Sequence, residues 1–195
     1  MGPIESLISH LSRLPGIGER TAARLAFYLL RANPQYRAGL SESIEALSTI
    51  HLCSSCSTVT DRDPCSICSS PVRNTKVLCV VEKPSDIYSI EKLGSFHGFY
   101  HVLHGLLSPM EGVGPQDLRI PQLLDRTSKH HFEEIILALS PTVEGDATAL
   151  YLSKQLMKLE ISLTRLASGL AVGTDLEFAD QISLGKAFEA RSRLR

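Results

Sequence analysis

The pattern of apolar and polar positions divides the 195-residue chain into three stretches and a tail. Residues 1–50 show apolar residues at helical spacing, interrupted at "LPGIG" and "RANPQYRAG". Residues 51–75 are polar and predict no helix. Residues 76–165 alternate apolar runs with helical stretches, which predicts a mainly parallel sheet joined by right-handed crossovers.

The same pattern predicts the individual elements of the sheet region and the tail. Strands are expected at 76–81, 98–103, 133–139 and 161–167, and helices at 85–93, 121–130 and 144–160. The tail is rich in glycine up to Thr174 and is expected to be helical from Ser183 to a basic end at Arg191, Arg193 and Arg195. The fold class expected from these elements is α+β, with several small domains.

The composition is that of an ordinary globular protein, with 43% hydrophobic residues, 21% charged residues and a net charge of −1. A chain with so little net charge attracts nucleic acid only through a local basic patch. No secretory signal and no apolar stretch of membrane-spanning length is evident, which predicts a cytoplasmic location and no membrane partner. In that compartment the five cysteines are expected to be reduced or bound to metal.

Four of the cysteines form two pairs in "CSSCSTVTDRDPCSIC": Cys53 with Cys56 and, after eight residues, Cys65 with Cys68. Two such pairs can place four thiolates about 2.3 Å from one ion in the tetrahedral arrangement of zinc. The alternative, a pair of disulfides or of reactive dithiols, suits a reducing compartment less well. Because four cysteine ligands leave no position for a bound water, we predict one structural Zn²⁺ per chain and no catalytic zinc.

The first stretch contains "LSRLPGIGERTAARLAFYLLR", in which two helices are joined through Gly16 and Gly18. Glycines allow backbone N–H groups to approach a phosphate closely, and the following helix N-terminus adds free donors. At about 100° per residue, Arg20, Arg24 and Arg31 lie together on the side of that helix opposite its apolar residues. This favours a helix-hairpin-helix that binds the DNA backbone independently of sequence. A helical corner with a solvated arginine face is the alternative.

The motifs occur in the order found in the RecR family of bacterial recombination mediators. The hairpin, the cysteine pairs, "VVEKPSDIYSIE", "YHVLHGLLSPMEGVGP" and "SPTVEGDATALYL" together resemble that family over essentially the whole chain. The resemblance implies a non-catalytic protein that acts with RecO and RecF to load the recombinase onto single-stranded DNA at gaps and breaks. It also implies a Toprim domain, the module in which primases and topoisomerases hold magnesium.

In catalytic Toprim domains a Glu ends the first strand, and an Asp-x-Asp pair followed by x-Glu-Gly ends a later one. Glu82 and Glu144 match this pattern, but Ser140 and Thr142 stand at the two aspartate positions. Magnesium needs hard anionic oxygens, and neutral hydroxyls add no negative charge. We therefore expect no two-metal chemistry at this site. A magnesium-dependent nuclease or topoisomerase-like enzyme is the alternative function, and a plain zinc-ribbon interaction module is a third.

By the same resemblance, this face receives a RecO-like partner instead of a metal, and RecF is a second partner. Glu82, Asp86, Glu144 and Asp146 are expected to form an acidic patch near the strand ends, which complements a basic surface. The helix dipole offers another explanation for three of these carboxylates, since Asp86, Glu144 and Asp146 all come early in expected helices. The two explanations are compatible.

The resemblance also assigns domains and an assembly. It places a helix-hairpin-helix DNA-binding region at 1–52, a C4-type zinc finger at 53–75, a Toprim domain at 76–170 and a C-terminal oligomerisation arm at 171–195. The family precedent is a homotetrameric ring that encircles DNA and associates with the nucleoid during repair. Phe27 is expected near the basic side of the hairpin. Two alternative roles are open for it, stacking on a base or forming a subunit contact. Since no GxxxxGK[ST] loop occurs, ATP hydrolysis is not expected.

Overall fold

The structure, a computed structural model, describes residues 2–159, 161–170, 173 and 175–191. It divides into two compact units, Met1–Ile50 and His51–Arg195. Of the predicted C-terminal arm and its basic end, residues 171, 172, 174 and 192–195 lie outside the described residues. None of the described helices is both long and apolar enough to cross a bilayer.

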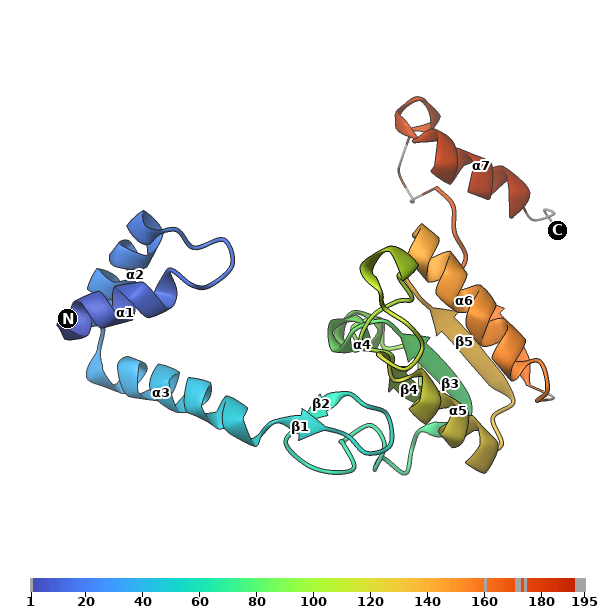
Figure 1. The fold of residues 1–195 in the computed structure, drawn as a ribbon, viewed down its shortest axis with the longest axis horizontal. Helices are drawn as coiled ribbons and strands as arrows, with labels where there is room; N and C mark the ends of the chain where they lie inside the picture. The colour runs from blue at the N-terminus through green and yellow to red at the C-terminus, as the bar shows by residue number, and fades with distance from the viewer. Residues whose placement is uncertain (1, 160, 171–172, 174, 192–195) are drawn as a thin grey trace. The chain divides into compact units, whose positions relative to one another are not determined.

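The first unit is helical, as the sequence predicted (Figure 1). Two small side chains, Ala22 and Ala26, are buried where the second helix packs on the first, and they let the two backbones approach closely. Phe27 and Tyr28 of the same helix stay half-exposed. The elements of this unit are α1 (Pro3–Leu11), α2 (Glu19–Arg31), α3 (Pro34–Glu45) and the 3-10 turn η1 (Ala46–Thr49).

The sequence predicted a break between helices at residues 31–39. This is wrong from Pro34 onward, because α3 begins at that residue. The side chain of Asn33 accepts a hydrogen bond from the Gln35 N–H at 2.8 Å and caps the helix. Asparagine at the N-cap followed by proline at the first helical position starts a helix, since proline lacks the N–H that would be left unpaired there. Pro34 at the first helical position therefore begins α3 within the stretch that was predicted to be a break.

The second unit opens with a small two-stranded antiparallel sheet, β1 (His51–Leu52) paired with β2 (Val59–Thr60). The rest of the cysteine-rich stretch is turns, in agreement with the absence of a predicted helix. This segment is tied to the larger sheet through the main chain, because the Val102 N–H donates to the Cys56 carbonyl at 2.9 Å.

The larger sheet is fully parallel and has the strand order β4-β3-β5-β6, which confirms the predicted α/β region. The chain turns back over β3 between β4 and β5, so the strand order reverses at the β3–β5 junction. In open parallel sheets a crevice forms at such a junction, outside the carboxyl ends of the strands. The strands are β3 (Asn74–Val81), β4 (Gly98–Val102), β5 (Glu134–Ala138) and β6 (Ser162–Arg165).

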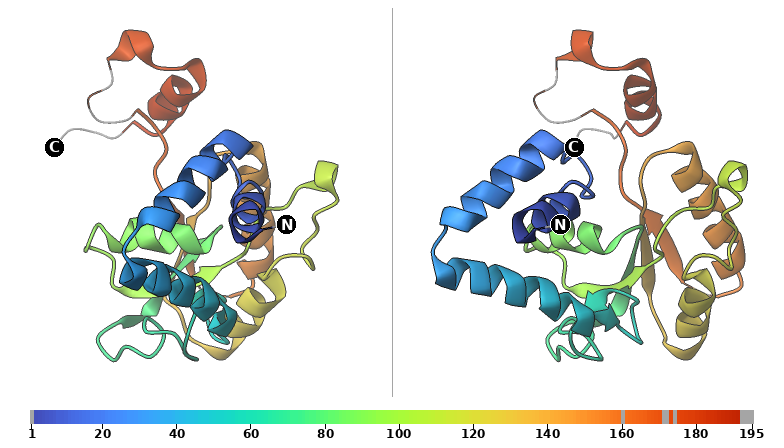
Figure 2. Two further views of the ribbon diagram at one scale, coloured as in Figure 1. Left: turned by 90° about the vertical axis from the view of Figure 1, so that its left-hand side faces the viewer. Right: turned by 60° about the vertical axis from the view of Figure 1, so that its left-hand side comes forward.

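Helices cover both faces of this sheet (Figure 2). Alternate residues of β3 point to opposite faces, so Leu78 and Val80 join the core under α5 and α6, whereas Cys79 and Val81 join the core under α4. Burial on both faces explains the continuous apolar run of this strand. The helices are α4 (Pro84–Glu91), α5 (Ile120–Lys129) and α6 (Val143–Leu156), with the 3-10 turn η2 (Pro109–Glu111) before α5.

The C-terminal segment contains the 3-10 turn η3 (Leu176–Phe178) and α7 (Gln181–Glu189). The predicted start at Ser183 was late by two residues. Asp180 is the N-cap, and its carboxylate accepts a hydrogen bond from the Ser183 N–H at 2.8 Å. An N-cap aspartate satisfies an otherwise free backbone donor and so sets the first turn of a helix.

Candidate metal centre and nucleic-acid interface

The two cysteine pairs converge on one point. Each of Cys53, Cys56, Cys65 and Cys68 offers a sulfur atom, and the four lie within 4.8 Å of one another. Sulfurs at the corners of a tetrahedral zinc site are separated by about 3.8 Å, given bonds of about 2.3 Å. The measured separation of Cys56 Sγ and Cys65 Sγ is 3.6 Å, so the cluster fits a zinc ion. The same distance is far too long for a disulfide bond.

Backbone N–H groups support the sulfur atoms. The Cys65 N–H donates to Cys53 Sγ at 3.3 Å, and the Cys68 N–H donates to Cys65 Sγ at 3.5 Å. Such donors stabilise thiolate charge and orient the ligands of a metal. Hydrogen bonds from Cys56 and Cys68 lower the pKa of the Cys65 thiol, whereas the hydrogen bond to Cys65 and burial raise the pKa of the Cys56 thiol. Cys79, by contrast, is buried in β3, and burial raises its pKa to about 12, as expected of a core thiol.

Two histidines in and after β4 bind backbone carbonyls of other segments of the second unit. The ring of His104 donates from Nε2 to the Ser57 carbonyl at 2.6 Å, which links the second unit's large sheet to the turn after Cys56. His101 is fully buried and donates from Nε2 to the Arg119 carbonyl at 2.9 Å. Burial lowers the pKa of His101 to about 4, so it stays neutral at physiological pH. Both side chains therefore have a structural role, as hydrogen-bond donors to the main chain.

The hairpin of the first unit brings its glycines and basic residues to the start of α2. Gly16 adopts a φ of +78°, a left-handed conformation that favours glycine, and Gly18 is the N-cap of α2. Arg20 and Arg24 are exposed on α2, as is Arg31 at its end. The free N–H groups of the first turn and the positive end of the helix dipole lie beside the first of these arginines. This is the arrangement that binds a phosphate group.

The Toprim-like site expected from the sequence lies at the carboxyl ends of β3 and β5. Glu82 follows β3 directly and is 8% exposed. Ser140 Oγ donates to Glu82 Oε2 at 2.5 Å, and Lys83 Nζ lies 2.9 Å from Glu82 Oε1. Burial alone would raise the pKa of Glu82, but the hydrogen bonds from Ser140 and Lys83 and the charge of Lys83 lower it overall. Both carboxylate oxygens are therefore occupied by groups of the protein.

Thr142, at the second aspartate position, caps α6. Its Oγ1 accepts a hydrogen bond from the Gly145 N–H at 3.1 Å. Gly145 lies so close to the preceding turn that a Cβ there would be 1.9 Å from the Ser140 carbonyl oxygen. Both hydroxyl residues thus serve the local structure, one as a donor to Glu82 and the other as a helix cap. Within the described part of the chain, the cysteine cluster is the one set of side chains grouped closely enough to hold a metal.

The four predicted acidic residues do not share one environment. Glu82 and Glu144 line one cavity of about 370 Å³. Asp86 accepts a hydrogen bond from the Lys83 N–H at 2.8 Å and caps α4. Asp146 forms an ion pair with Arg165, and this contact lowers its pKa.

Two neighbours of these carboxylates were missed by sequence reasoning. Glu111 of η2 lines the cavity with Glu82 and Glu144, and Lys186 of α7 lies 3.8 Å from Asp146. Both belong to loops or arms that return to the site from distant parts of the chain. No local pattern marks such a return.

Comparisons with known proteins agree over the length of the chain. Residues 4–47 match the helix-hairpin-helix model of RecR, residues 50–70 match the RecR zinc finger domain with four cysteines, and residues 169–192 match the C-terminal model of RecR. Residues 76–167 match the Toprim domain. The cysteine geometry and the zinc finger match agree on the cofactor, which is one structural zinc ion.

Three curated relatives, each named "Recombination protein RecR", illustrate the similarity. The protein of Desulfitobacterium hafniense (strain Y51) is 52% identical over 193 residues, which cover 98% of this chain and 96% of the relative. The protein of Myxococcus xanthus (strain DK1622) is 51% identical, with 98% of both chains covered. That of Anaeromyxobacter sp. (strain Fw109-5) is 48% identical with the same coverage. The chain therefore belongs to the RecR family of recombination proteins.

Proposed function

We propose that this chain is a DNA-binding protein of recombination and repair that performs no catalysis of its own. The observation that carries the proposal is the hairpin, where Gly16, the start of α2 and the exposed Arg20 and Arg24 provide donors and charge for a phosphate. These groups recognise the backbone, which is the same in every sequence. Gly16, Gly18, Arg20, Arg24 and Arg31 are the proposed contact residues.

The Toprim-like site supports a non-catalytic role. A serine donates to Glu82 where an aspartate would have to accept a metal ion, and Lys83 brings a positive charge to the same carboxylate. A nearby cation disfavours a second cation, so magnesium would have to displace Lys83. The magnesium-dependent nuclease is therefore the weaker hypothesis.

We assign RecO-like and RecF-like proteins as partners, with the recombinase loaded onto single-stranded DNA as the outcome. The cavity lined by Glu82, Glu111 and Glu144 is an acidic surface that suits a basic partner. Asp86 and Asp146 lie at the starts of the adjoining helices α4 and α6. A pull-down with a RecO-type protein and Glu144→Lys tests the assignment, and undiminished capture would remove this face from it.

We also propose the homotetrameric ring in the bacterial cytoplasm. Its support is the exposed apolar surface at both ends of the chain, including Phe27 and Tyr28 of α2 and Phe178 and Phe188 near α7. Such patches mark contacts between proteins. Light scattering on the purified full-length chain measures the assembly, and a monomer at micromolar concentration would contradict the ring.

Replacing Arg20 and Arg24 by alanine is expected to weaken binding of the full-length protein to DNA of any sequence. Each lost phosphate contact reduces the magnitude of the slope of log affinity against log salt by roughly 0.7 to 0.9. The magnitude of this slope should therefore fall by roughly 1.4 to 1.8 in the double variant. Fluorescence anisotropy with two unrelated oligonucleotides over a salt series measures both quantities. An unchanged slope would exclude the hairpin.

Two controls separate charge from folding. Lys92→Ala removes one exposed positive charge next to α4, and it should leave DNA affinity close to that of the wild type. Replacing Arg20 and Arg24 by lysine keeps the charge and should restore most of the salt dependence, although the bidentate geometry of arginine is lost.

A further inference from the structure

A buried arginine in α5 has no carboxylate partner. Arg126 is 8% exposed, its Nη1 donates to the Tyr100 carbonyl at 2.6 Å, and its Cζ lies 5.7 Å from the ring centres of both Phe99 and Phe132. Its Nε is buried without a hydrogen-bond partner, and no ion pair of this guanidinium occurs among the described residues. Buried charges are normally paired, because an uncompensated charge in a poorly solvated place is costly.

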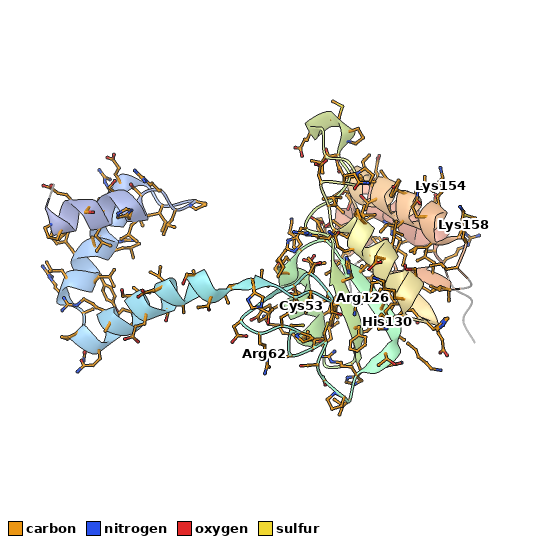
Figure 3. All side chains as sticks on the ribbon, turned by 60° about the horizontal axis from the view of Figure 1, so that its bottom comes forward. Cys53, Arg62, Arg126, His130, Lys154 and Lys158 are labelled. Atoms are coloured by element: carbon orange, nitrogen blue, oxygen red, sulfur yellow. The ribbon has the colours of Figure 1, made fainter. Side chains whose placement is uncertain are left out.

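Arg126 lines a cavity of about 400 Å³ that is bounded by the cysteine segment and α5. Ser54 and Ser55 form one wall, and Gln122, Lys129 and His130 contribute from the other side. Figure 3 shows Arg126 and His130 on α5 beside the segment that carries Cys53. The cavity therefore adjoins an arginine that has no ion pair and whose Nε is buried without a hydrogen-bond partner.

Among the side chains that line the cavity, Arg126 is the formal charge that has no ion pair in the described parts of the chain. The one acidic side chain that lines the cavity, Asp125, forms an ion pair with Lys129 at 2.7 Å, so these two charges offset each other. The hydroxyl of Ser54 already donates to Asp63 at 2.9 Å, so Ser54 lines the cavity but its hydroxyl proton is not free for a ligand. Asp63 and the thiolates of the cysteine cluster add negative charge behind that wall, but none of them forms an ion pair with Arg126. A purely structural role, in which Arg126 ties α5 to β4, accounts for Nη1 and the aromatic contacts but not for the cavity that adjoins the side chain.

We propose that this cavity binds a phosphate group of the DNA backbone, which makes it a second DNA contact, in the unit that carries the zinc. The inference rests on the proposed DNA-binding function. A phosphodiester is favoured over a carboxylate of a protein partner because the same unit carries further exposed cations. Figure 3 shows Arg62 on the cysteine segment, Lys154 on α6 and Lys158 just after it, with Arg126 between them in that view, and none of the three has an ion pair in the described parts of the chain. Several solvated cations on one protein can contact successive phosphates of a polyanion such as DNA.

Gln122→Glu tests the cavity without touching the core. Gln122 is exposed and lines the cavity one helical turn before Arg126, so the variant adds one carboxylate of nearly the same shape beside it. Gln116→Glu is the matched control, because Gln116 is exposed in the loop before α5 and does not line the cavity. Both variants change the net charge of the chain by the same amount.

The first readout uses inorganic phosphate alone. Thermal unfolding of the zinc-bound, full-length protein is followed in phosphate and in chloride of equal ionic strength. A ligand that binds the folded state raises the melting temperature with its concentration. We expect phosphate to raise it for the wild type and for Gln116→Glu but not for Gln122→Glu. Equal responses of the three proteins would overturn the assignment.

The second readout is binding of a labelled single-stranded oligonucleotide over a salt series. Gln122→Glu should weaken binding several-fold and lower the salt slope by roughly 0.7, the contribution of one contact with single-stranded DNA. Its effect should add to that of the Arg20→Ala, Arg24→Ala pair, since the two sites are independent. Arg126→Met should reproduce it. If that variant does not fold, Gln122→Glu still decides, because its position is exposed.

The outcomes separate this inference from the function on which it rests. Loss of affinity in the hairpin variant, with wild-type affinity and slope in Gln122→Glu, would overturn the second contact and leave the DNA-binding function in place. Wild-type binding in both variants would overturn both. Polyglutamate and the unlabelled oligonucleotide are compared as competitors for the labelled oligonucleotide. If polyglutamate competes equally well, the phosphate assignment is wrong and the ligand of the cavity is an acidic protein segment.

Discussion

At the scale of single residues, Glu82 is held by an internal hydrogen bond and an ion pair at the carboxyl end of β3. Ser140 stands where a catalytic domain would supply an aspartate, and it donates to Glu82. Lys83 neutralises the same carboxylate from the other side. A carboxylate that is buried and satisfied in this way stabilises the fold, whereas a set of unpaired carboxylates would need a cation.

Ser140→Ala should destabilise the second unit by about 1–3 kcal/mol at neutral pH, because a hydrogen bond to a buried charged group is lost. The pKa of Glu82 is lowered in the folded state, so its contribution is present above its ordinary pKa and is lost as the pH falls through the folded value. The variant raises that folded pKa. Its deficit relative to the wild type should therefore shrink in acid.

Urea unfolding at a series of pH values measures this deficit. Ser128→Ala is the control, since Ser128 is exposed and its hydroxyl donates to a backbone carbonyl of its own helix. A deficit that is the same at acidic and neutral pH would show that Ser140 acts independently of the charge on Glu82.

At the scale of elements, the start of α6 is held against the end of β5 by a close backbone contact. Gly145 is buried, and the hydroxyl of Thr142 accepts from its N–H. The turn that contains Ser140 fills the space where a side chain at position 145 would lie. The placement of Glu144 at the cavity depends on this contact, because Glu144 is in the first turn of the same helix.

Gly145→Ala should destabilise the protein by about 1–3 kcal/mol, because its methyl group would overlap the Ser140 carbonyl and force the helix away. Gly39→Ala should instead raise the free energy of unfolding by about 0.5–1 kcal/mol. Gly39 lies in the interior of α3 with open space around it, and alanine loses less backbone entropy there. Denaturant unfolding of the two variants measures both effects, and a neutral result for Gly145→Ala would contradict the close contact.

At the scale of the whole molecule, the zinc ion supports more than its own ligands. The Val102 N–H donates to the Cys56 carbonyl, and His104 donates to the Ser57 carbonyl, so the edge strand β4 is paired with the cysteine segment. Ser54 and Ser55 of that segment also form a wall of the cavity at Arg126. Loss of zinc should therefore disturb the sheet edge and the cavity together.

Removing zinc with a chelator should cost the second unit several kcal/mol, since the polar cysteine segment buries too little apolar surface to fold alone. The Val102 amide should exchange with deuterium slowly in the zinc form and rapidly after removal. Added Zn²⁺ should restore protection, and Mg²⁺ should not, because a hard cation prefers oxygen ligands. Unchanged protection of Val102 in the zinc-free protein would contradict this coupling.

The sequence by itself determined the features that depend on local pattern and spacing. Apolar runs such as 76–81 predicted the strands, because a strand buried on both faces is continuously apolar. The spacing of Cys53, Cys56, Cys65 and Cys68 predicted the zinc site, since each pair lies within one turn of chain. The hydroxyl residues Ser140 and Thr142, at the two aspartate positions of the Toprim pattern, predicted that this site lacks two carboxylates. The error at Pro34 came from a residue that can either end a helix or begin one.

The tertiary structure decided what depends on segments far apart in the chain. It alone showed that Ser140 donates to Glu82 across the β3–β5 junction, that Lys186 approaches Asp146, and that Arg126 lies unpaired beside the cysteine segment. Periodicity shows which residues share a face of one element. It cannot show which faces meet, because strand order and crossovers bring those residues together only in the folded chain.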